Sequence, residues 1–256
     1  MPLSSGTVKF ITSLRQKKFR QSYHKFIVEG TRSVAELLAQ DRYRIDHLYA
    51  LGDYAETTPP PPGVPLTPVS ARELGRISQL TTPNRVLAVV DLPTDTATEL
   101  PTGAGAGWSL YLDGVQSPSN LGALLRIADW FGFGYVFGGP GTADLYNPKS
   151  IQASMGSFLR IDYRRATLED YVAQFPDLPR YGADLAGRNV YGLAAPPAGL
   201  LVIGAEGRGL SPAAGALIQH RLTIPRAPGR RAESLNAAVA AGILCGALVN
   251  PTPTLP

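Results

Sequence analysis

The sequence predicts a two-domain α/β protein with a mainly parallel sheet covered by helices. Short apolar segments alternate with segments of helical periodicity through most of the 256 residues. A stretch rich in proline, threonine, glycine and alanine interrupts this alternation at residues 93–107 and is typical of an interdomain linker. Hydrophobic residues make up 44% of the chain and charged residues 17%, which is enough apolar material to bury a core.

The first domain is predicted to span residues 1–92 as a small α/β unit. Four consecutive prolines at residues 59–62 must lie in a loop, and the wholly apolar segment at residues 86–90 is typical of a central strand. The expected elements are a basic helix at 7–22, a strand at 26–28, a helix at 31–39, a strand at 45–51, a helix at 70–77 and the strand at 86–90.

The second domain is predicted to span residues 108–250, and the proline-rich residues 251–256 are expected to form a flexible tail. The alternation restarts at residue 108 and continues to a closing helix. The expected strands are 108–112, 135–138, 180–183, 200–204 and 222–224, and the expected helices are 120–131, 148–155, a short one after residue 211 and 234–249.

The basic residues are unevenly distributed, although the net charge is only +4. No acidic residue precedes Glu29, and a second basic run includes Arg226, Arg230 and Arg231. Either run alone could be a solvated face. Two such runs, one of them next to a polar motif, favour a polyanionic partner.

Cysteine and histidine usage argues against a disulfide framework and a metal centre. Cys245 is the only cysteine, and the three histidines are scattered along the chain. The N-terminal stretch lacks the apolar region of a signal peptide, and the longest apolar run, at residues 237–249, is too short to span a bilayer. We therefore expect a cytoplasmic protein without a metal or a membrane partner.

Three polar segments follow predicted strands of the second domain, at residues 112–122, 203–211 and 224–236. Each has a purely structural interpretation, because Asn120 and Ser234 could be helix caps and the glycines of the second segment could form a tight turn. In parallel sheets, however, ligands bind beyond the carboxyl ends of the strands. The three segments together therefore favour a ligand site.

Other sequence fingerprints do not fit. Gly103, Gly105 and Gly107 precede a predicted strand, whereas a dinucleotide-binding fingerprint follows a strand and opens a helix. The sequence contains no G-x-x-x-x-G-K-[ST], which excludes a P-loop. Ser154 and Ser157 lack the G-x-S-x-G context of a hydrolase nucleophile.

The three segments resemble the motifs of the SpoU-type RNA ribose 2′-O-methyltransferases of the SPOUT superfamily. The first contains N-x-G-x-x-x-R-x-A at residues 120–128, the second G-x-E-x-x-G-L at 204–210, and the third Ile-Pro followed by Glu-Ser-Leu-Asn at 233–236. Residues 146–156 also match, and the stretch at 25–30 resembles a substrate-binding domain similar to a ribosomal protein fold. The resemblance covers nearly all of the chain.

This resemblance implies a C-terminal domain tied in a deep trefoil knot, although knots are rare among protein folds. It also implies a homodimer formed through the C-terminal domain and S-adenosylmethionine as the cofactor. By the same resemblance, the cofactor is held at the knot by the second and third motifs. The implied cofactor-binding residues are Gly204, Glu206, Gly209, Leu210, Ile224, Ser234 and Leu235.

The implied reaction transfers a methyl group to a ribose 2′-hydroxyl, and its barrier falls when polar groups position that hydroxyl and stabilise its developing charge. In the family, the arginine matching Arg126 has been proposed as the general base. A guanidinium stays protonated, so we expect Arg126 to bind the target phosphate and polarise the hydroxyl. The expected catalytic residues are Asn120, Arg126, Glu206, Ser234 and Asn236.

The implied substrate is a structured RNA, ribosomal or transfer, with ribosomal RNA favoured. The first domain is expected to grip this RNA by neutralising its phosphates. The expected RNA-binding residues are Arg15, Lys17, Lys18, Arg20 and Lys25, with Arg230 and Arg231 of the second basic run.

Two departures and two alternatives stand beside this interpretation. Arg226 occupies a position where the family usually has methionine, and residues 224–234 form a longer stretch than usual, which leaves both cofactor and RNA contacts open for it. A catalytically inactive RNA-binding protein of the same fold would be expected to lose the polar motif residues, which are intact here. Methylation of a base is disfavoured because the third motif is of the ribose-modifying type.

Overall fold

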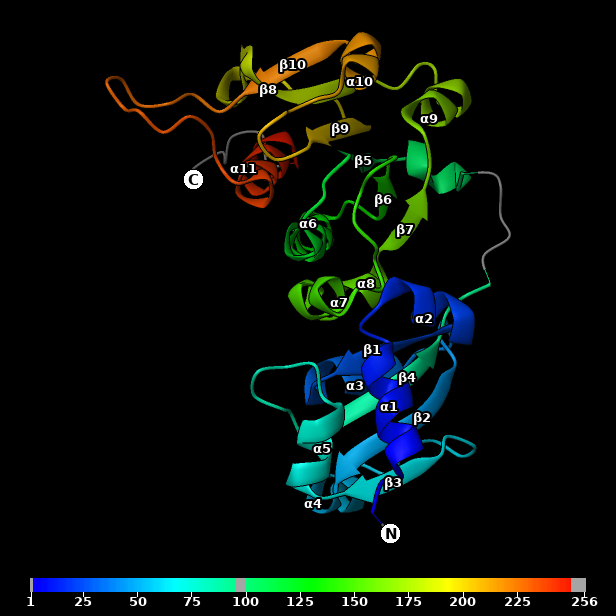
Figure 1. Cartoon of the computed structure of the whole chain (residues 1–256). Coiled ribbons are helices and arrows are strands. Elements are labelled where there is room, and N and C mark those ends of the chain that lie inside the picture. The colour runs from blue at the N-terminus through cyan, green and yellow to red at the C-terminus, as the bar shows by residue number, and fades with distance from the viewer. Residues whose placement is uncertain (1, 95–99, 250–256) are drawn as a thin grey trace, which may run out of the picture. The chain divides into compact units, whose positions relative to one another are not determined.

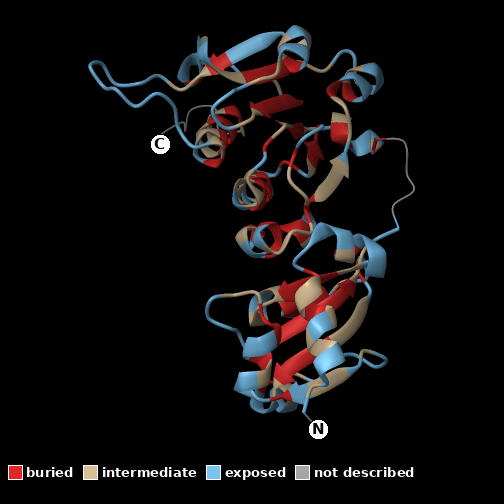
Figure 2. Ribbon diagram, viewed as in Figure 1, coloured by how far each residue is buried: buried red, intermediate tan, exposed pale blue. Residues whose placement is uncertain are grey.

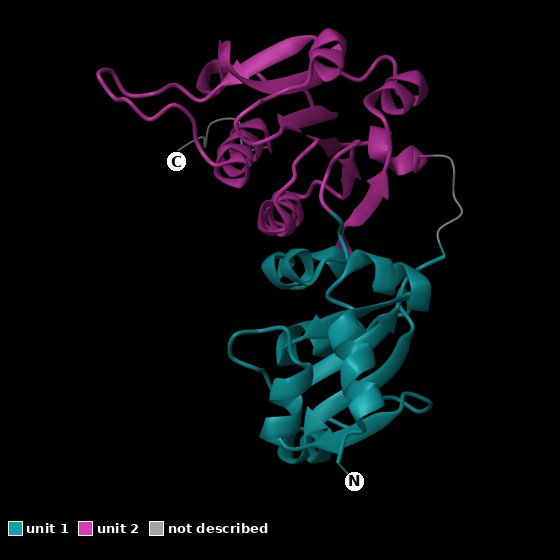
Figure 3. Ribbon diagram, in the orientation of Figure 1, with its two compact units in different colours: residues 1–96, 144–159 teal, residues 97–143, 160–256 magenta. Residues whose placement is uncertain are grey.

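The computed structural model describes residues 2–94 and 100–249, which divide into two compact units (Figure 3). The first unit comprises residues 1–96 together with residues 144–159, and the second comprises residues 97–143 and 160–256. The predicted tail at 251–256 lies outside the described residues. Figure 2 shows that the strands of each unit are largely buried while the outer faces of its helices are exposed.

The first unit contains a four-stranded sheet in the order β1-β4-β2-β3 (Figure 1). The apolar strand β4 is central, as predicted, and it pairs antiparallel with both β1 and β2. The elements of residues 2–94 are α1 (Ser5–Ser13), α2 (Lys17–Tyr23), β1 (Lys25–Glu29), α3 (Thr31–Leu38), β2 (Ile45–Leu51), α4 (Gly52–Thr57), β3 (Leu66–Val69), α5 (Ala71–Ile77) and β4 (Val86–Asp91).

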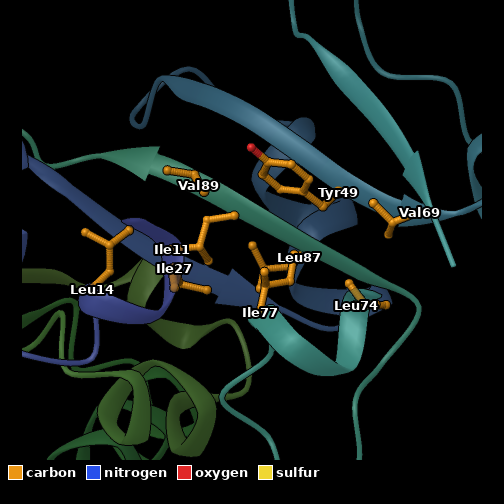
Figure 4. Packing of buried hydrophobic residues seen from close by; sticks show 9 residues of the cluster. All are labelled: Ile11, Leu14, Ile27, Tyr49, Val69, Leu74, Ile77, Leu87 and Val89. Carbon is orange, nitrogen blue, oxygen red and sulfur yellow. The ribbon is translucent and has the colours of Figure 1, made fainter. Parts of the chain in front are cut away.

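A hydrophobic core fills the space between this sheet and helices α1 and α5. Figure 4 shows side chains from both helices pointing at the sheet, among them Ile11 of α1 and Ile77 of α5, which are fully buried. The nine buried members of the cluster are Ile11, Leu14, Ile27, Tyr49, Val69, Leu74, Ile77, Leu87 and Val89.

The prediction of one helix over residues 7–22 was wrong, because this region forms two helices, α1 and α2, separated by a short non-helical segment. Leu14 ends the first helix, and Gln16 adopts an extended conformation before the second begins. The guanidinium of Arg20 on α2 turns back and donates hydrogen bonds to the carbonyl oxygens of Leu14 and Arg15, both at 2.9 Å. These carbonyls lie at the end of α1, where they have no helical partner.

Arg20 and Phe26 join the segment 144–159 to the rest of the first unit. The Arg20 side chain is only 2% exposed, and it forms an ion pair with Asp144 at 2.5 Å. Phe26 of β1 packs against Tyr146, with the ring centroids 4.7 Å apart, and against Phe158 at 6.3 Å. The assignment of Arg20 to RNA phosphates is therefore corrected, because its guanidinium is buried and occupied by partners within the protein.

Replacing Arg20 by methionine is expected to lower the free energy of unfolding by about 3 kcal/mol, because it leaves Asp144 and two carbonyls without their donor. Urea unfolding measures the difference. Lys17→Met is the matched control, since Lys17 is exposed on the same helix, and its effect is expected within about 0.5 kcal/mol. Equal effects of the two substitutions would contradict a structural role for Arg20.

The second unit is built on a six-stranded sheet, parallel throughout, in the order β10-β8-β9-β5-β6-β7. This agrees with the predicted α/β class. Its elements are η1 (Thr102–Gly105), β5 (Trp108–Asp113), α6 (Pro118–Phe131), β6 (Tyr135–Gly138), β7 (Asp162–Arg165), α9 (Leu168–Gln174), β8 (Arg180–Asn189), η2 (Val190–Gly192), β9 (Gly199–Gly204), α10 (Pro212–Leu217), β10 (His220–Thr223) and α11 (Ala237–Val249). Between β6 and β7 the chain forms α7 (Pro148–Ser154) and α8 (Ser157–Arg160).

Part of the stretch interpreted as a linker is packed into the second unit. Leu100 and Ala104 are buried in a cluster with Tyr111 of β5. The side-chain amide of Gln174 also donates to the carbonyl of Leu100 at 2.7 Å and accepts from its N–H at 3.2 Å. Small residues allow this close packing. A composition rich in glycine and alanine is therefore compatible with both a packed segment and a flexible linker.

Candidate active site

The three polar segments follow β5, β9 and β10, whose carboxyl ends lie at one edge of the parallel sheet. β5 and β9 are adjacent, and the last residue of β5, Asp113, is in register with Gly204, the last residue of β9. The first two segments therefore start side by side. β8 separates β9 from β10, so the third segment leaves the same edge two strands away.

Asp113 links the first segment to the second. Its carboxylate accepts hydrogen bonds from the backbone N–H of Ser211 at 2.6 Å and from the Ser211 hydroxyl at 3.2 Å. The same hydroxyl accepts from the N–H of Ala214 and caps α10. Asp113 and Ser211 were not among the predicted site residues. The available signal was a carboxylate at the last position of a buried strand.

The segment after β9 forms a tight loop that requires glycine. Ala205 and Gly209 exchange backbone hydrogen bonds of 3.0 and 2.9 Å across the loop. A Cβ atom at Gly204 would lie 2.2 Å from the carbonyl carbon of Gly209, which is too close for any side chain. Gly207 and Gly209 have φ values of +79° and +69°, which glycine adopts without strain.

A chain of side-chain hydrogen bonds joins all three segments. The amide nitrogen of Asn120 donates to Oε1 of Glu206 at 2.6 Å, and the amide nitrogen of Asn236 donates to Oδ1 of Asn120 at 3.0 Å. Oδ1 of Asn236 accepts from the N–H groups of Ala238 and Val239. The capping bonds fix the orientation of the Asn236 amide, which in turn fixes that of Asn120, so the donors of the chain point towards Glu206.

Helices α6 and α11 bring their N-terminal ends to this chain. They pack in parallel, since Gly242 and Gly246 of α11 lie against Ile127 and Phe131 of α6, while Asn236 meets Asn120 at the start of both helices. The small glycines allow the close approach. The positive ends of two helix dipoles therefore point to the region of the Glu206 carboxylate, which favours a negative charge there.

The pKa of Glu206 is lower than that of an ordinary glutamate. Burial raises the pKa, but hydrogen bonds from the Asn120 side chain and from backbone N–H groups, including those of Gln116 and Ser117, lower it by more in total. Glu206 is therefore a carboxylate at neutral pH. It acts as a hydrogen-bond acceptor that holds Asn120 in place.

Arg126 and Ser234 do not join this chain of hydrogen bonds. The Arg126 side chain is exposed on α6 and makes no hydrogen bond or ion pair with the described residues. Ser234 is exposed in the loop before α11, and the predicted start of the closing helix at residue 234 was wrong. Asn236 caps that helix instead of Ser234, because its carbonyl oxygen accepts the first free N–H groups.

The segment between β10 and α11 projects from the second unit as a long loop (Figure 1). Residues 225–236 are all exposed, and within the loop Arg226 donates to the carbonyl of Ala232 at 2.8 Å. Arg230 and Arg231 make no ion pair with the described residues. The Leu235 side chain is 48% exposed, and the backbone groups of Ser234 and Leu235 make no hydrogen bond to another backbone group of the described part.

Neither a metal site nor a membrane span is found in the described residues. No group of three or more His, Cys, Asp or Glu side chains there could hold a metal ion. None of the helices within residues 2–94 and 100–249 has the length and apolar character that crossing a bilayer requires.

The second unit is a parallel α/β domain with hydrogen-bonded polar side chains and a glycine loop at the carboxyl edge of its sheet. This arrangement is typical of the ligand-binding domains of enzymes. Residues 107–246 match the family described as SpoU rRNA Methylase family, and residues 6–88 match the MRM3-like substrate binding domain. The chain therefore belongs to the SpoU rRNA methylase family.

Individual relatives agree with this membership over nearly the whole chain. The chain is 30% identical to the 23S rRNA (guanosine(2553)-2′-O)-methyltransferase RlmP of Bacillus subtilis over 93% of each protein. A TrmH-family structure from Porphyromonas gingivalis has 38% identity and a TM-score of 0.86, and it covers 98% of this chain and all of the other. An AdoMet-bound rRNA methyltransferase structure from Sinorhizobium meliloti has 25% identity and a TM-score of 0.81, with 97% and 95% covered.

Proposed function

We propose that this protein transfers a methyl group from S-adenosylmethionine to a ribose 2′-hydroxyl of structured RNA, with ribosomal RNA as the favoured substrate. The observation that carries the proposal is the hydrogen-bonded chain Asn236–Asn120–Glu206 beside the glycine loop of β9. Membership of the SpoU rRNA methylase family supports it. The intact polar chain disfavours a catalytically inactive RNA-binding protein.

The residues of the site fit S-adenosylmethionine. Gly204 lets the loop fold back closely on the end of β9, since a side chain there would clash with the backbone of Gly209. An added Cβ at Gly209 would have nothing within 4 Å, so the backbone there is open to a ligand. Among the described residues, the backbone groups of Ser234 and Leu235 have no backbone partner, and the exposed Leu235 side chain offers apolar cover for a heterocycle. We propose that these four residues, with Glu206, Leu210 and Ile224, hold the cofactor.

The bound cofactor supplies an electrophilic sulfonium methyl group, and the protein orients the ribose hydroxyl in line with it. The side-chain amide nitrogens of Asn120 and Asn236 each carry two hydrogens. Each uses one hydrogen in the bonds that join Asn236, Asn120 and Glu206, so one remains on each for a substrate oxygen. Such fixed donors stabilise the charge that develops on the hydroxyl oxygen as its proton passes to water and the C–O bond to the methyl group forms. We propose Asn120 and Asn236 as these donors, Glu206 as the group that orients Asn120, and Arg126 and Ser234 as further contacts of the RNA.

Arg126→Lys is expected to lower kcat at least about tenfold, because lysine keeps the charge but cannot contact a phosphate through two parallel N–H groups. Single-turnover kinetics with saturating cofactor measure the change, and Arg72→Lys on α5 of the first unit is the control for the same substitution at an exposed arginine. Near-normal turnover of the Arg126 variant would make a specific guanidinium role untenable.

Residues 1–92 are proposed to bind the RNA substrate, and residues 108–250 to carry out catalysis. The matched substrate-binding domain at residues 6–88 supports this division. The cations available to phosphates are fewer than predicted, because Arg20 is buried and Lys25 forms ion pairs with Asp46 and Asp91. Arg15, Lys17, Lys18, Arg230 and Arg231 are exposed and stay in the proposal.

We also propose a cytoplasmic homodimer formed through the second domain, with a trefoil knot in that domain as the family resemblance implies. Exposed apolar side chains on α6 and α11, Trp130 at 84% and Val239 at 52%, support an interface on these helices. Sedimentation velocity tests the dimer, and a monomer at micromolar concentration would contradict it.

Incubation with methyl-labelled S-adenosylmethionine and total bacterial RNA tests the proposed function. We expect label in one RNA species, at a nucleotide that resists alkaline hydrolysis because its 2′-hydroxyl is methylated. Label on a base would favour the alternative chemistry. Binding of RNA and cofactor without any transfer would favour the inactive alternative.

A further inference from the structure

Helices α1 and α2 of the first unit carry three aromatic side chains that contact one another. The rings of Phe10 on α1 and Tyr23 on α2 meet edge to face, with centroids 5.1 Å apart. Phe19 and Tyr23, four residues apart on α2, lie nearly parallel, at 6.2 Å and an interplanar angle of 16°. The three rings therefore form one continuous cluster.

This cluster reaches the protein surface instead of closing a core. Tyr23 is 46% exposed, and Phe10 and Phe19 are only partly buried. Phe10 also packs against the core cluster beneath α1, so it anchors the group. Two nearly parallel rings on α2 thus present aromatic surface to solvent, and contiguous exposed apolar surface is typical of interaction sites.

The helices that carry the aromatic cluster also carry exposed lysines. Lys9, Lys17 and Lys18 are exposed, and none forms an ion pair with another residue in the described ranges. The Nζ atom of Lys18 lies 4.8 Å from the centre of the Phe19 ring. No acidic residue precedes Glu29 in the sequence, so nothing within these helices offsets the charge. This combination suits a partner that has both phosphates and flat rings.

Helix α2 is held firmly enough to present such a surface. Arg20 ties it to the carbonyl oxygens at the end of α1 and to Asp144. At its other end, His24 adopts a left-handed conformation with φ of 50° and closes the helix by donating to the carbonyl of Arg20. The orientation of Phe19 and Tyr23 is therefore set before any partner binds, which reduces the entropy lost on binding.

We propose that the aromatic–lysine surface, formed by Lys9, Phe10, Lys17, Lys18, Phe19 and Tyr23, stacks an unpaired nucleotide of the RNA substrate on Tyr23. The inference rests on the proposed function, in that the partner is RNA. Bases in a duplex are stacked on their neighbours and offer no free face, whereas bases in loops and bulges can be splayed out onto aromatic side chains. The lysines neutralise the flanking phosphates. The surface thus selects RNA with a single-stranded element.

The test uses two RNA probes, a hairpin with 2-aminopurine in its loop and a fully paired duplex with 2-aminopurine in a base pair. We expect the protein to bind the hairpin more tightly and to quench its fluorescence through stacking. Tyr23→Ala is expected to weaken hairpin binding by roughly five- to one-hundredfold, the effect of losing one stacked base, and to abolish the quenching. Duplex binding is expected to change little.

Two further variants separate stacking from other effects. Tyr23→Phe keeps the ring and is expected to retain hairpin affinity and quenching, and Gln21→Ala alters an exposed neutral residue of the same helix and is expected to behave like the wild type. If Tyr23→Ala bound the hairpin as tightly as the wild type, the stacking surface would be refuted and the exposed ring would belong to a different kind of partner.

The inference and the proposed function fail in different ways. A wild-type protein that methylates RNA while Tyr23→Ala leaves hairpin binding unchanged retains the function and loses the stacking surface. A wild-type protein that transfers no methyl group loses the proposed function, and hairpin binding still decides whether the stacking surface exists.

Discussion

Replacing Glu206 by glutamine is expected to lower kcat about a hundredfold, while cofactor affinity falls less. Oε1 of Glu206 accepts from the Asn120 amide and Oε2 lies 3.4 Å from the N–H of Gln116. Glutamine has the same size but replaces one acceptor oxygen by an NH₂ group. In either orientation of its amide, this NH₂ group faces another donor, the amide of Asn120 or the N–H of Gln116. Asn120 loses its fixed position, and a displacement of about 1 Å in a positioning group can cost about a hundredfold in rate.

Glu169→Gln is the matched control, because Glu169 is an exposed glutamate on α9 of the same unit and makes no ion pair with the described residues. Single-turnover methyl transfer gives the rate, and calorimetric titration with S-adenosylmethionine gives the affinity. A Glu206→Gln enzyme with unaltered kcat would show that the orientation of Asn120 does not limit the chemical step.

The lowered pKa of Glu206 makes the stability difference between the wild type and Glu206→Gln depend on pH, with a predictable sign. A carboxylate whose pKa is depressed in the folded protein stabilises the fold above its unfolded pKa of about 4.3. That contribution is lost as the pH falls through the depressed pKa. The stability difference between wild type and Glu206→Gln should therefore be constant near neutral pH and shrink in acid.

The sequence predicted the α/β class and most strands because their apolar segments are short, continuous and separated by turn residues. It missed β7, whose residues are mostly polar because the strand lies at the edge of the sheet beyond β6. It also missed β3, which contains Pro68 and is again an edge strand, where proline is tolerated. Edge strands lack the two-sided burial that makes a strand recognisable in a sequence.

The candidate site was predictable in its residue types and less so in its contacts. Asn120, Glu206 and Asn236 come together because the ends of β5 and β9 adjoin and α6 packs in parallel with α11, which only the tertiary structure reveals. Arg20 is a residue whose role the sequence did not predict. It has the same charge as its exposed neighbours, and nothing local indicates that Asp144, far along the chain, would bury it.

Gly204→Ala is expected to raise the Kd for S-adenosylmethionine by about tenfold to a hundredfold, with methyl transfer falling in parallel at subsaturating cofactor. The added Cβ would lie 2.2 Å from the carbonyl carbon of Gly209 and 2.5 Å from the nitrogen of Leu210. Both are backbone atoms, which cannot rotate away as the end of a side chain can. Relief requires the loop to open, at the roughly 1–3 kcal/mol typical of overpacking.

The strain of the Gly204→Ala substitution is expected to weaken cofactor binding because only the loop after β9 can move to relieve it. Gly204 is held on one side by its register with Asp113, at the end of a buried strand, and this side cannot yield cheaply. The exposed loop closed by Ala205 and Gly209 can yield, since two backbone hydrogen bonds close it. Opening the loop displaces the glycines proposed to meet the cofactor while the sheet stays intact.

Gly134→Ala separates this effect from the general cost of a glycine substitution. Gly134 lies in the same unit just before β6, and a Cβ there has nothing within 4 Å. We expect this variant to bind cofactor like the wild type. Circular dichroism should show the same fold for both variants. If Gly204→Ala bound the cofactor normally, the loop after β9 would not be part of the cofactor site, and the binding residues would have to be sought in the loop before α11.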